Sequence, residues 1–341
     1  MVNPFTLVHS EVSLIRLRLK RPFKTALGSK TDTVNAVVRL RLQSSAEGRG
    51  EASSSVVWAS TRPARLASTL RRLAKKFHGR DARTLASEIW DEAGTVPPAA
   101  SAFECALAEA EALTAGTDLW HRCGAAKTQL TTDLTLSAEG PGATRSAART
   151  AAEEGFRTLK IKVGTKGDFA RVEAAHQAGG KPRIILDGNQ KLGLSGSLRL
   201  LDKCLKKNMR IVLLEQPVSA DNPNEFLECA RRSPVPVAAD ESLRSIDDAC
   251  RIIDSGVRAA FNIKLSKTGF EKSLRIASLA HASGTPLMIG CMQESSAGLA
   301  TSASLAAGTG WFSFVDLDSD HLLAEGPEGP FVRSGPVLRR R

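Results

Sequence analysis

Three carboxylates recur at near-constant spacing, and each ends a short apolar run of the chain. The runs RIILD, IVLLE and VPVAAD end at Asp187, Glu215 and Asp240, with intervals of 28 and 25 residues. Apolar runs that end on a polar residue are typical of parallel strands buried on both faces. Three acids at one end of successive strands would repel one another unless a cation neutralised them, and hard oxygen ligands favour Mg²⁺. The pattern therefore predicts a metal-dependent barrel enzyme.

Lysines interrupt two other apolar runs. In TLKIKV, residues 158–163, strand alternation points Lys160 and Lys162 to the same side. Lys264 lies within AAFNIKL, residues 259–265. Ammonium groups are costly inside a barrel or beneath a helix, so these lysines need a polar site. By position, Lys264 lies across the barrel mouth from Lys162, which suggests two acid/base groups on opposite faces of a bound substrate.

The chain from about residue 130 reads as a regular alternation of strands and helices. Polar residues near the strand ends follow one another at intervals of 24 to 28 residues, and several helical stretches end at glycine. Eight such units predict the α/β class and a closed parallel (β/α) barrel of the TIM type, with right-handed crossovers. The predicted strands are 131–137, 158–163, 183–187, 211–215, 236–240, 259–265, 286–292 and 312–318.

The first part of the chain follows a different pattern. Residues 11–19 and 34–42 alternate apolar and polar side chains, as half-buried antiparallel strands do, and the segment between them reads as a flexible loop. Helical patterns follow at about 63–77, 81–93 and 99–115. We therefore predict an α+β capping domain over 1–125, a catalytic barrel over 126–320, and an extended C-terminal segment, 321–341, that returns to the cap.

The composition excludes several classes of protein. No signal peptide is evident, no window approaches 18 consecutive apolar residues, and the six cysteines form no CxxC pair. These features predict a cytoplasmic protein with reduced thiols and no membrane contact. The net charge is +11, but the basic residues are dispersed and aromatic residues make up 5% of the chain, with no Tyr. We therefore expect a solvated basic surface and no nucleic-acid partner.

Six strings carry a family resemblance. LKIKVG, LDGNQ, LLEQPV, AADES, NIKLSKTG and GCMQES, in this order and spacing, resemble the muconate-lactonising subgroup of the enolase superfamily. RPFKTAL and GRGEA extend the resemblance to the capping domain. That superfamily uses a lysine or histidine base with Mg²⁺, which stabilises an ene-diolate. GCMQES and the Asp316-Leu317-Asp318 motif further resemble dipeptide epimerases, in which two aspartates hold the α-ammonium group of the substrate.

The resemblance implies a role for each matching position. Asp187, Glu215 and Asp240 resemble the Mg²⁺ ligands, and Lys162 and Lys264 resemble the two acid/base catalysts. The implied reaction is epimerisation of a dipeptide at the α-carbon of its C-terminal residue, by 1,1-proton transfer through an enediolate. A homo-oligomer is compatible with this reading. The implied substrate-binding residues are Thr135, Lys160, Cys291, Asp316 and Asp318, with Met292 contributing backbone.

Other readings remain open. A cycloisomerase or an o-succinylbenzoate synthase of the same superfamily needs no ammonium recognition, so the two aspartates argue against both. A non-catalytic basic binding protein on the same barrel is a remote alternative, because all three acids and three lysines are retained. Ala-Glu epimerases follow PFKTAL with an arginine that recognises glutamate, whereas this chain has Gly28 there. We therefore expect a C-terminal substrate residue other than glutamate.

Neighbouring polar residues receive structural interpretations. Because Glu241 directly follows Asp240, one of the two side chains must face away from the site, and we assign Asp240 as the ligand. Asn189 is expected to support the site without coordinating the metal. Lys267 lies beyond the predicted strand and is expected to be a solvated loop lysine. Glu51 is assigned to the structure of the capping domain.

Overall fold

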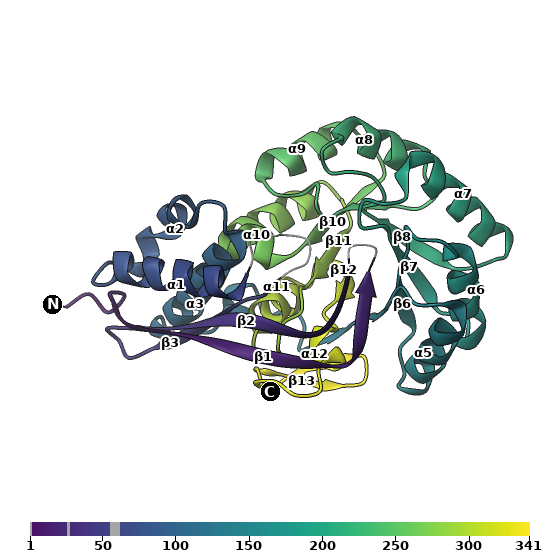
Figure 1. The fold of residues 1–341 in the computed structure, drawn as a ribbon. Coiled ribbons are helices and arrows are strands. Elements are labelled where there is room, and N and C mark those ends of the chain that lie inside the picture. The colour runs from purple at the N-terminus through teal and green to yellow at the C-terminus, as the bar shows by residue number, and fades with distance from the viewer. Residues whose placement is uncertain (1, 26–27, 55–61) are drawn as a thin grey trace.

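The computed structural model describes residues 2–25, 28–54 and 62–341. A sheet-and-helix cap lies beside a ring of strands surrounded by helices, and a long two-stranded hairpin runs from the cap along the barrel (Figure 1). The predicted fold class is confirmed, since the larger sheet has eight parallel strands in sequential order.

Each barrel strand lies within or close to its predicted range. The apolar runs form strands because their side chains alternate between the barrel interior and the surrounding helices, so both faces are buried. The strands are β5 (Leu134–Leu136), β6 (Thr158–Lys162), β7 (Arg183–Asp187), β8 (Ile211–Glu215), β9 (Val237–Ala239), β10 (Ala259–Ile263), β11 (Leu287–Gly290) and β12 (Phe312–Asp316). The helices that follow them are α5 (Pro141–Glu153), α6 (Asp168–Ala178), α7 (Gly193–Lys206), α8 (Pro223–Arg232), α9 (Ile246–Asp254), α10 (Leu265–Ala282), α11 (Ala300–Thr309) and α12 (Ser319–Leu322).

Apolar side chains fill the barrel interior below the strand ends. Burying each larger side chain of this layer contributes about 1.5–3 kcal/mol to stability. The polar side chains of the site therefore lie above this apolar layer, toward the strand ends. Two residues later, on the same face of four of these strands, lie the polar residues Asp187, Glu215, Asp240 and Asn262. The interior cluster consists of Ile185, Leu213, Ala238, Ala260 and Met288.

The two end strands of the sheet order, β5 and β12, meet through the segment that precedes β5. The backbone N–H of Asp133 donates to Val315 O (2.9 Å), and the Leu317 N–H donates to Thr132 Oγ1 (2.9 Å). The Thr135 N–H donates to Asp318 Oδ2 (2.6 Å). These bonds bring Asp133, Asp316 and Asp318 into one buried region.

The cap combines an antiparallel sheet, in the order β1-β2-β3, with helices that cover one of its faces. The helix predicted at 63–77 is confirmed, whereas the pattern at 81–93 is divided between a 3₁₀ turn and a helix. A Cβ on Gly50 would lie 1.7 Å from Ala102 O, so only glycine lets the sheet approach the third helix this closely. The cap elements are β1 (Leu7–Thr25), β2 (Gly28–Leu42), β3 (Glu47–Ala52), α1 (Pro63–Phe77), η1 (Ala82–Thr84), α2 (Ala86–Ala93), α3 (Pro97–Thr114) and α4 (Leu119–Arg122).

The expected flexible loop over residues 20–33 is wrong. β1 and β2 continue through this segment and pair as far as Thr25 and Gly28, with a register shift between Arg18 and Phe23. Pro22 lies within that shift, where the regular pairing of the two strands is interrupted. Proline has no backbone N–H to donate, so it is tolerated at such an interruption. The turn residues 26–27 lie outside the described part of the chain.

The C-terminal segment is not a single extended strand. β13 (Phe331–Ser334) and β14 (Val337–Arg340) form a hairpin about Gly335, and β14 pairs with β4 (Gln129–Thr131), which precedes the first barrel strand in the chain. Before that hairpin, Leu323 pairs with Leu19 of β1, so the segment also contacts the cap.

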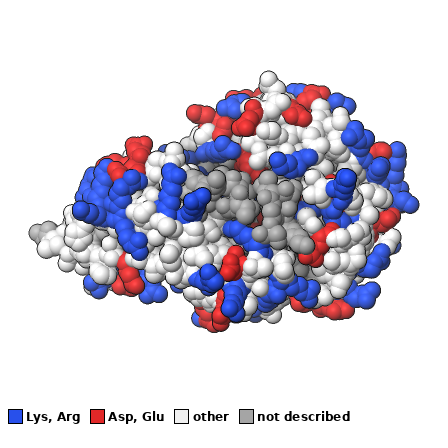
Figure 2. All heavy atoms as spheres, in the orientation of Figure 1, with Lys and Arg blue, Asp and Glu red and all other residues white. Residues whose placement is uncertain are grey.

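Basic groups lie on the surface of both the cap and the barrel (Figure 2). On the face shown in Figure 2, basic groups gather over the cap and are elsewhere mixed with acidic groups. The paired basic residues of α1, which include Arg71 and Lys75, are exposed. Within the described ranges, none of the helices has the length and apolar character needed to cross a membrane.

Candidate active site

The three strand-end carboxylates gather at one end of the barrel, as their spacing predicts. Asp187 and Glu215 are the last residues of β7 and β8 and lie opposite each other in the strand register. Asp240 directly follows β9, the next strand of the sheet. All three are buried. We call them the strand-end acids.

Lysine ammonium groups lie among these acids. Lys162 Nζ lies 2.6 Å from Asp187 Oδ2, and Lys264 Nζ lies 2.6 Å from Asp240 Oδ2. Lys160 Nζ lies 3.1 Å from Asp187 Oδ2, which confirms that Lys160 and Lys162 point to the same side of β6. Because β6 and β10 are separated by three strands in the sheet, Lys162 and Lys264 approach the row of acids from its two ends.

The lysines and the burial together set the protonation of the acids. Burial alone raises the pKa of Asp187 and of Asp240, but Lys162 beside the first and Lys264 beside the second hold both below the usual range. Burial, followed by repulsion from Asp187, raises the pKa of Glu215 to about 7. Glu215 is therefore the strand-end acid whose negative charge is least compensated by its neighbours.

The donor set fits a divalent cation. Glu215 Oε2 is buried and accepts no hydrogen bond from the described residues, although Lys160 Nζ lies 2.7 Å away. The ligands offered are all carboxylate oxygens from adjacent strands, the chemistry that Mg²⁺ prefers. A cation between them would supply the positive charge that Glu215 lacks.

Two positioning residues were missed in the sequence. Asn262 Nδ2 donates to Glu215 Oε1 (2.9 Å), and Gln216 Oε1 accepts from the backbone N–H of Asp240 (2.9 Å). Asn262 stands two residues before Lys264 and shares its side of β10, so strand alternation could have found it. A Cβ on Gly290 would lie 2.8 Å from Lys264 Cε, so glycine at this point of β11 makes room for the lysine.

The expectation of a solvated Lys267 is wrong. Its ammonium group is buried and donates to Asp240 Oδ1 (2.8 Å), Asp240 O (2.5 Å) and Asn262 O (2.9 Å). The sequence did not reveal this because Lys267 lies beyond the end of β10, in the first turn of α10. Lys267 therefore holds Asp240 Oδ1, while Lys264 contacts Asp240 Oδ2.

Replacing Lys267 with methionine is expected to destabilise the protein strongly. Each buried acceptor left without a donor costs about 1–3 kcal/mol. Asp240 O keeps the bond from the Leu243 N–H, but Asp240 Oδ1 and Asn262 O lose the Lys267 donor, so we expect a loss of at least about 2 kcal/mol. Thermal unfolding in the presence of a chelator measures this without any contribution from bound metal. Lys206→Met, which removes an exposed ion pair with Asp202, is the control and should cost less than about 1 kcal/mol. Equal costs for the two variants would contradict the structural role of Lys267.

Other neighbours of the strand-end acids are arranged as supports. Glu241 lines a cavity formed with residues of α8 and α9, such as Phe226 and Arg251. Burial, followed by repulsion from Asp240, raises the pKa of Glu241 to about 7. The backbone N–H of Asn189 donates to Asp187 Oδ1 (3.0 Å), which helps to orient that carboxylate.

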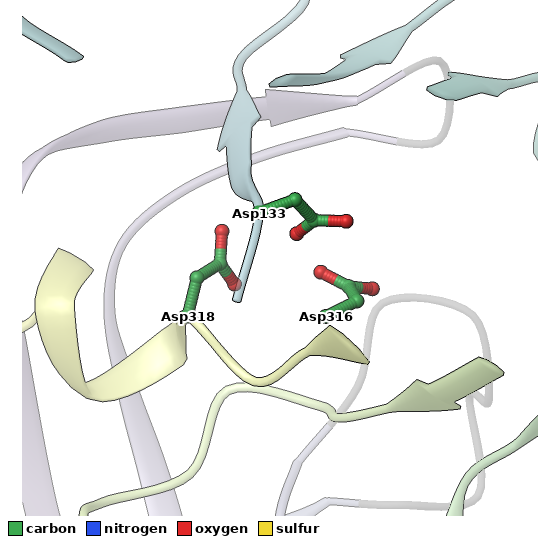
Figure 3. Close-up of side chains that lie close together, drawn as sticks. All are labelled: Asp133, Asp316 and Asp318. Carbon is green, nitrogen blue, oxygen red and sulfur yellow. The ribbon is translucent and has the colours of Figure 1, made fainter. Parts of the chain in front are cut away.

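A second group of carboxylates lies beside the first. Asp316 and Asp318, which the sequence singled out, meet Asp133, which it did not (Figure 3). The carboxylate oxygens of these three residues lie within 4.8 Å of one another, and we call them the second acid cluster. Lys160 connects the two groups, because its Nζ lies 2.7 Å from Asp316 Oδ2 and 2.7 Å from Glu215 Oε2.

The remaining predicted substrate-binding residues border the second acid cluster. Thr135 Oγ1 donates to Asp316 Oδ1 (3.3 Å), and its backbone N–H donates to Asp318. Cys291 follows the end of β11, and burial, then the charge of Asp316, raises the pKa of its thiol well above the usual range. A thiolate is therefore disfavoured, and the thiol of Cys291 is poorly suited to act as a nucleophile.

The cap reaches the same end of the barrel. Glu51 Oε1 accepts from the Ser295 N–H (3.0 Å), while Asn35 Nδ2 and Ser53 Oγ donate to Gln293 O (2.7 and 2.9 Å). Glu51 is thus a structural link between the cap and the loop that follows β11. The side chain of Lys24 and residues 26–27 and 55–61 lie outside the described part of the structure.

Comparisons with known proteins agree with this geometry. The family model described as Enolase C-terminal domain-like matches residues 143–337. The chain is 32% identical to an L-Ala-D/L-Glu epimerase of Thermotoga maritima, with 98% of each chain covered. It is 31% identical to an aromatic dipeptide epimerase of Herpetosiphon aurantiacus, over 98% of this chain and 96% of that one. A crystal structure of a dipeptide epimerase from Enterococcus faecalis, complexed with Mg and L-Leu-L-Tyr, superposes with a TM-score of 0.89 at 26% identity, covering 98% of this chain and 97% of that one.

Proposed function

We propose that this chain, which belongs to the Enolase C-terminal domain-like family, is an isomerase that epimerises dipeptides at the α-carbon of the C-terminal residue. One observation carries the proposal: two lysines approach a row of carboxylates from opposite ends, next to a separate acidic subsite. Relatives that match almost the full length and act on dipeptides support the same reading.

The proposed metal ligands are Asp187, Glu215 and Asp240. Mg²⁺ held there would neutralise the C-terminal carboxylate of the substrate and make the adjacent α-C–H more acidic. Lys160 adds a positive charge at the junction of the two acid groups, where that carboxylate would lie. The unbonded oxygen of Glu215 and the Mg in the related crystal structure support this assignment.

The two lysines would divide the proton transfer between them. One of Lys162 and Lys264 removes the α-proton from one face, and the other returns a proton to the opposite face. Each lysine must exchange roles when the reaction runs backwards, because both stereoisomers are substrates. Their placement on strands separated by three others supports action from opposite sides.

Asp316 and Asp318 would bind the α-ammonium group of the N-terminal residue. Both are buried and lie in a cluster of three carboxyl groups, one of which, Asp316, is in contact with the ammonium group of Lys160. This surplus of negative charge suits a cationic group of the substrate. The substrates of a cycloisomerase or an o-succinylbenzoate synthase need no recognition of an ammonium group. The acidic cluster therefore favours the epimerase.

The proposed function is tested by incubating the Mg²⁺-loaded protein with a panel of L,L-dipeptides. Chiral chromatography should reveal the L,D product for at least one dipeptide, with the C-terminal residue as the only centre inverted. Inversion of free amino acids but of no dipeptide would overturn the proposed substrate class.

The substrate preference is a further prediction. An arginine near the turn of the β1–β2 hairpin could pair with a glutamate side chain in two hydrogen bonds, and Gly28 cannot. We therefore expect kcat/KM for an apolar L-Ala-L-Xaa dipeptide to exceed that for L-Ala-L-Glu by about tenfold, or roughly 1.4 kcal/mol in transition-state binding. Asp318→Asn should raise KM for all these dipeptides alike, because they share the ammonium group. A tenfold preference for L-Ala-L-Glu would refute the argument from Gly28.

A further inference from the structure

Asp133 is a buried acid for which the proposed chemistry has no assigned role. It lies between β4 and β5, is 2% exposed, and is fixed by the hydrogen bond from its backbone N–H to Val315 O. Neither of its carboxyl oxygens accepts a hydrogen bond from any described residue. A buried polar group without a partner is costly, so this carboxyl needs a proton or a ligand.

The neighbours of Asp133 supply little positive charge. Its carboxyl group points toward that of Asp316, and Asp318 completes the second acid cluster (Figure 3). Among the charged groups that act on Asp133, the cation is Lys160 of β6. Lys160 already lies 2.7 Å from both Asp316 and Glu215. Three carboxyl groups therefore share less than one positive charge.

Electrostatics places a proton on Asp133. Burial, followed by repulsion from Asp316 and Asp318, raises the pKa of Asp133 well above its usual range. The contact with Lys160 instead holds the pKa of Asp316 below its usual range, despite burial. The pKa of Asp318 is raised to about 6, by burial and then by Asp316, so Asp318 is mostly ionised at neutral pH. The free cluster then holds two carboxylates and one carboxylic acid.

We propose that Asp133 is a third carboxyl group of the ammonium subsite, which carries a proton while the subsite is free and releases it to solvent when the ammonium group of a dipeptide binds. The O–H bond breaks, its electron pair stays on the Asp133 carboxylate, and the incoming ammonium group replaces the lost positive charge. Binding is then coupled to proton release, so affinity rises with pH. This inference rests on the proposed function, because it assumes a substrate with a free α-ammonium group.

The competing occupant of the cluster is a divalent cation, which three carboxylates within 4.8 Å of one another could also hold. The close approach of Lys160 to Asp316 favours an organic cation, since a metal ion there would meet the ammonium group of Lys160 directly. The two occupants are separated by experiment.

Calorimetric titration tests the proposal. The Mg²⁺-loaded protein is titrated at about pH 7.5 with the dipeptide on which it is most active, in two buffers of different ionisation enthalpy. The difference between the observed binding enthalpies gives the protons released. We expect release of about one proton by the wild type and close to none by Asp133→Asn, with affinity rising up to about tenfold per pH unit only in the wild type. Asp318→Asn should bind more weakly yet still release a proton, and the exposed Asp202→Asn should match the wild type.

The outcomes separate the inference from the proposed function. Turnover and binding of a dipeptide without proton release would overturn the role of Asp133 and leave the epimerase intact. Failure of every dipeptide to bind or react would overturn the proposed function itself. Titration with Mg²⁺ alone completes the test: if Asp133→Asn weakens Mg²⁺ binding more than Asp240→Asn does, the second acid cluster is the metal site and the proposal is wrong.

Discussion

Replacing either Lys162 or Lys264 with methionine is expected to abolish measurable epimerisation, with kcat falling at least about 100-fold and up to about 10⁴-fold. Each lysine is the donor or acceptor of a proton at one face of the α-carbon, so neither variant can complete the inversion. Methionine keeps the length of the side chain without the ammonium group. Chiral chromatography of the dipeptide products measures the loss.

The two lysine variants should each retain proton exchange, but with different stereoisomers. In D₂O, the lysine that survives in each variant can still exchange the α-proton of one stereoisomer, so the two variants should label opposite isomers. Lys166→Met, which changes an exposed lysine beyond the end of β6, is the control and should leave kcat unchanged. Exchange of the same isomer by both variants would contradict the division of the two faces between Lys162 and Lys264.

Removing the metal or one of its proposed ligands should reduce epimerisation about as much as replacing Lys162 or Lys264 does. Chelation is expected to abolish turnover, with Mg²⁺ restoring it, because the strand-end acids offer hard oxygen ligands. Asp240→Asn should weaken Mg²⁺ binding by more than about 100-fold, since even supporting residues of a metal site contribute 10- to 100-fold. Equilibrium titration with Mg²⁺ measures the affinity.

The neighbours of Asp240 provide matched controls. Glu241→Gln should weaken Mg²⁺ binding far less, because Lys264 and Lys267 contact the carboxylate of Asp240, whereas Glu241 lines a cavity with residues of α8 and α9. A larger effect at Glu241 than at Asp240 would mean that the wrong side chain has been assigned after β9. Full activity after exhaustive chelation would exclude the metal assignment altogether.

The barrel and the strand-end acids could be predicted because they depend on local pattern. A parallel strand buried on both faces must be apolar throughout, so the end of each run also marks the end of each strand, where Asp187 and Glu215 lie. The common side of Lys160 and Lys162 follows from alternation along a single strand. These inferences need no knowledge of distant contacts.

Features that depend on distant contacts could not be predicted in this way. Asp133 becomes buried only because the segment before β5 meets β12, nearly 200 residues later in the chain. Lys267 lies in the first turn of a helix, where exposed lysines are common, and its burial follows from the position of Asp240 on another strand. The long β1–β2 hairpin was missed because small polar residues and Pro22 are typical of loops, whereas pairing across the hairpin overrides that preference.

The central claim is that the two lysines exchange the α-proton of the C-terminal residue of a dipeptide. It is tested most directly by incubating the wild-type, Mg²⁺-loaded protein with a dipeptide library in D₂O and locating deuterium by fragmentation mass spectrometry. The account predicts one deuterium at the α-carbon of the C-terminal residue of the reactive dipeptides and none at the N-terminal α-carbon. Inversion of the C-terminal residue without deuterium incorporation, or labelling of the N-terminal residue, would contradict it.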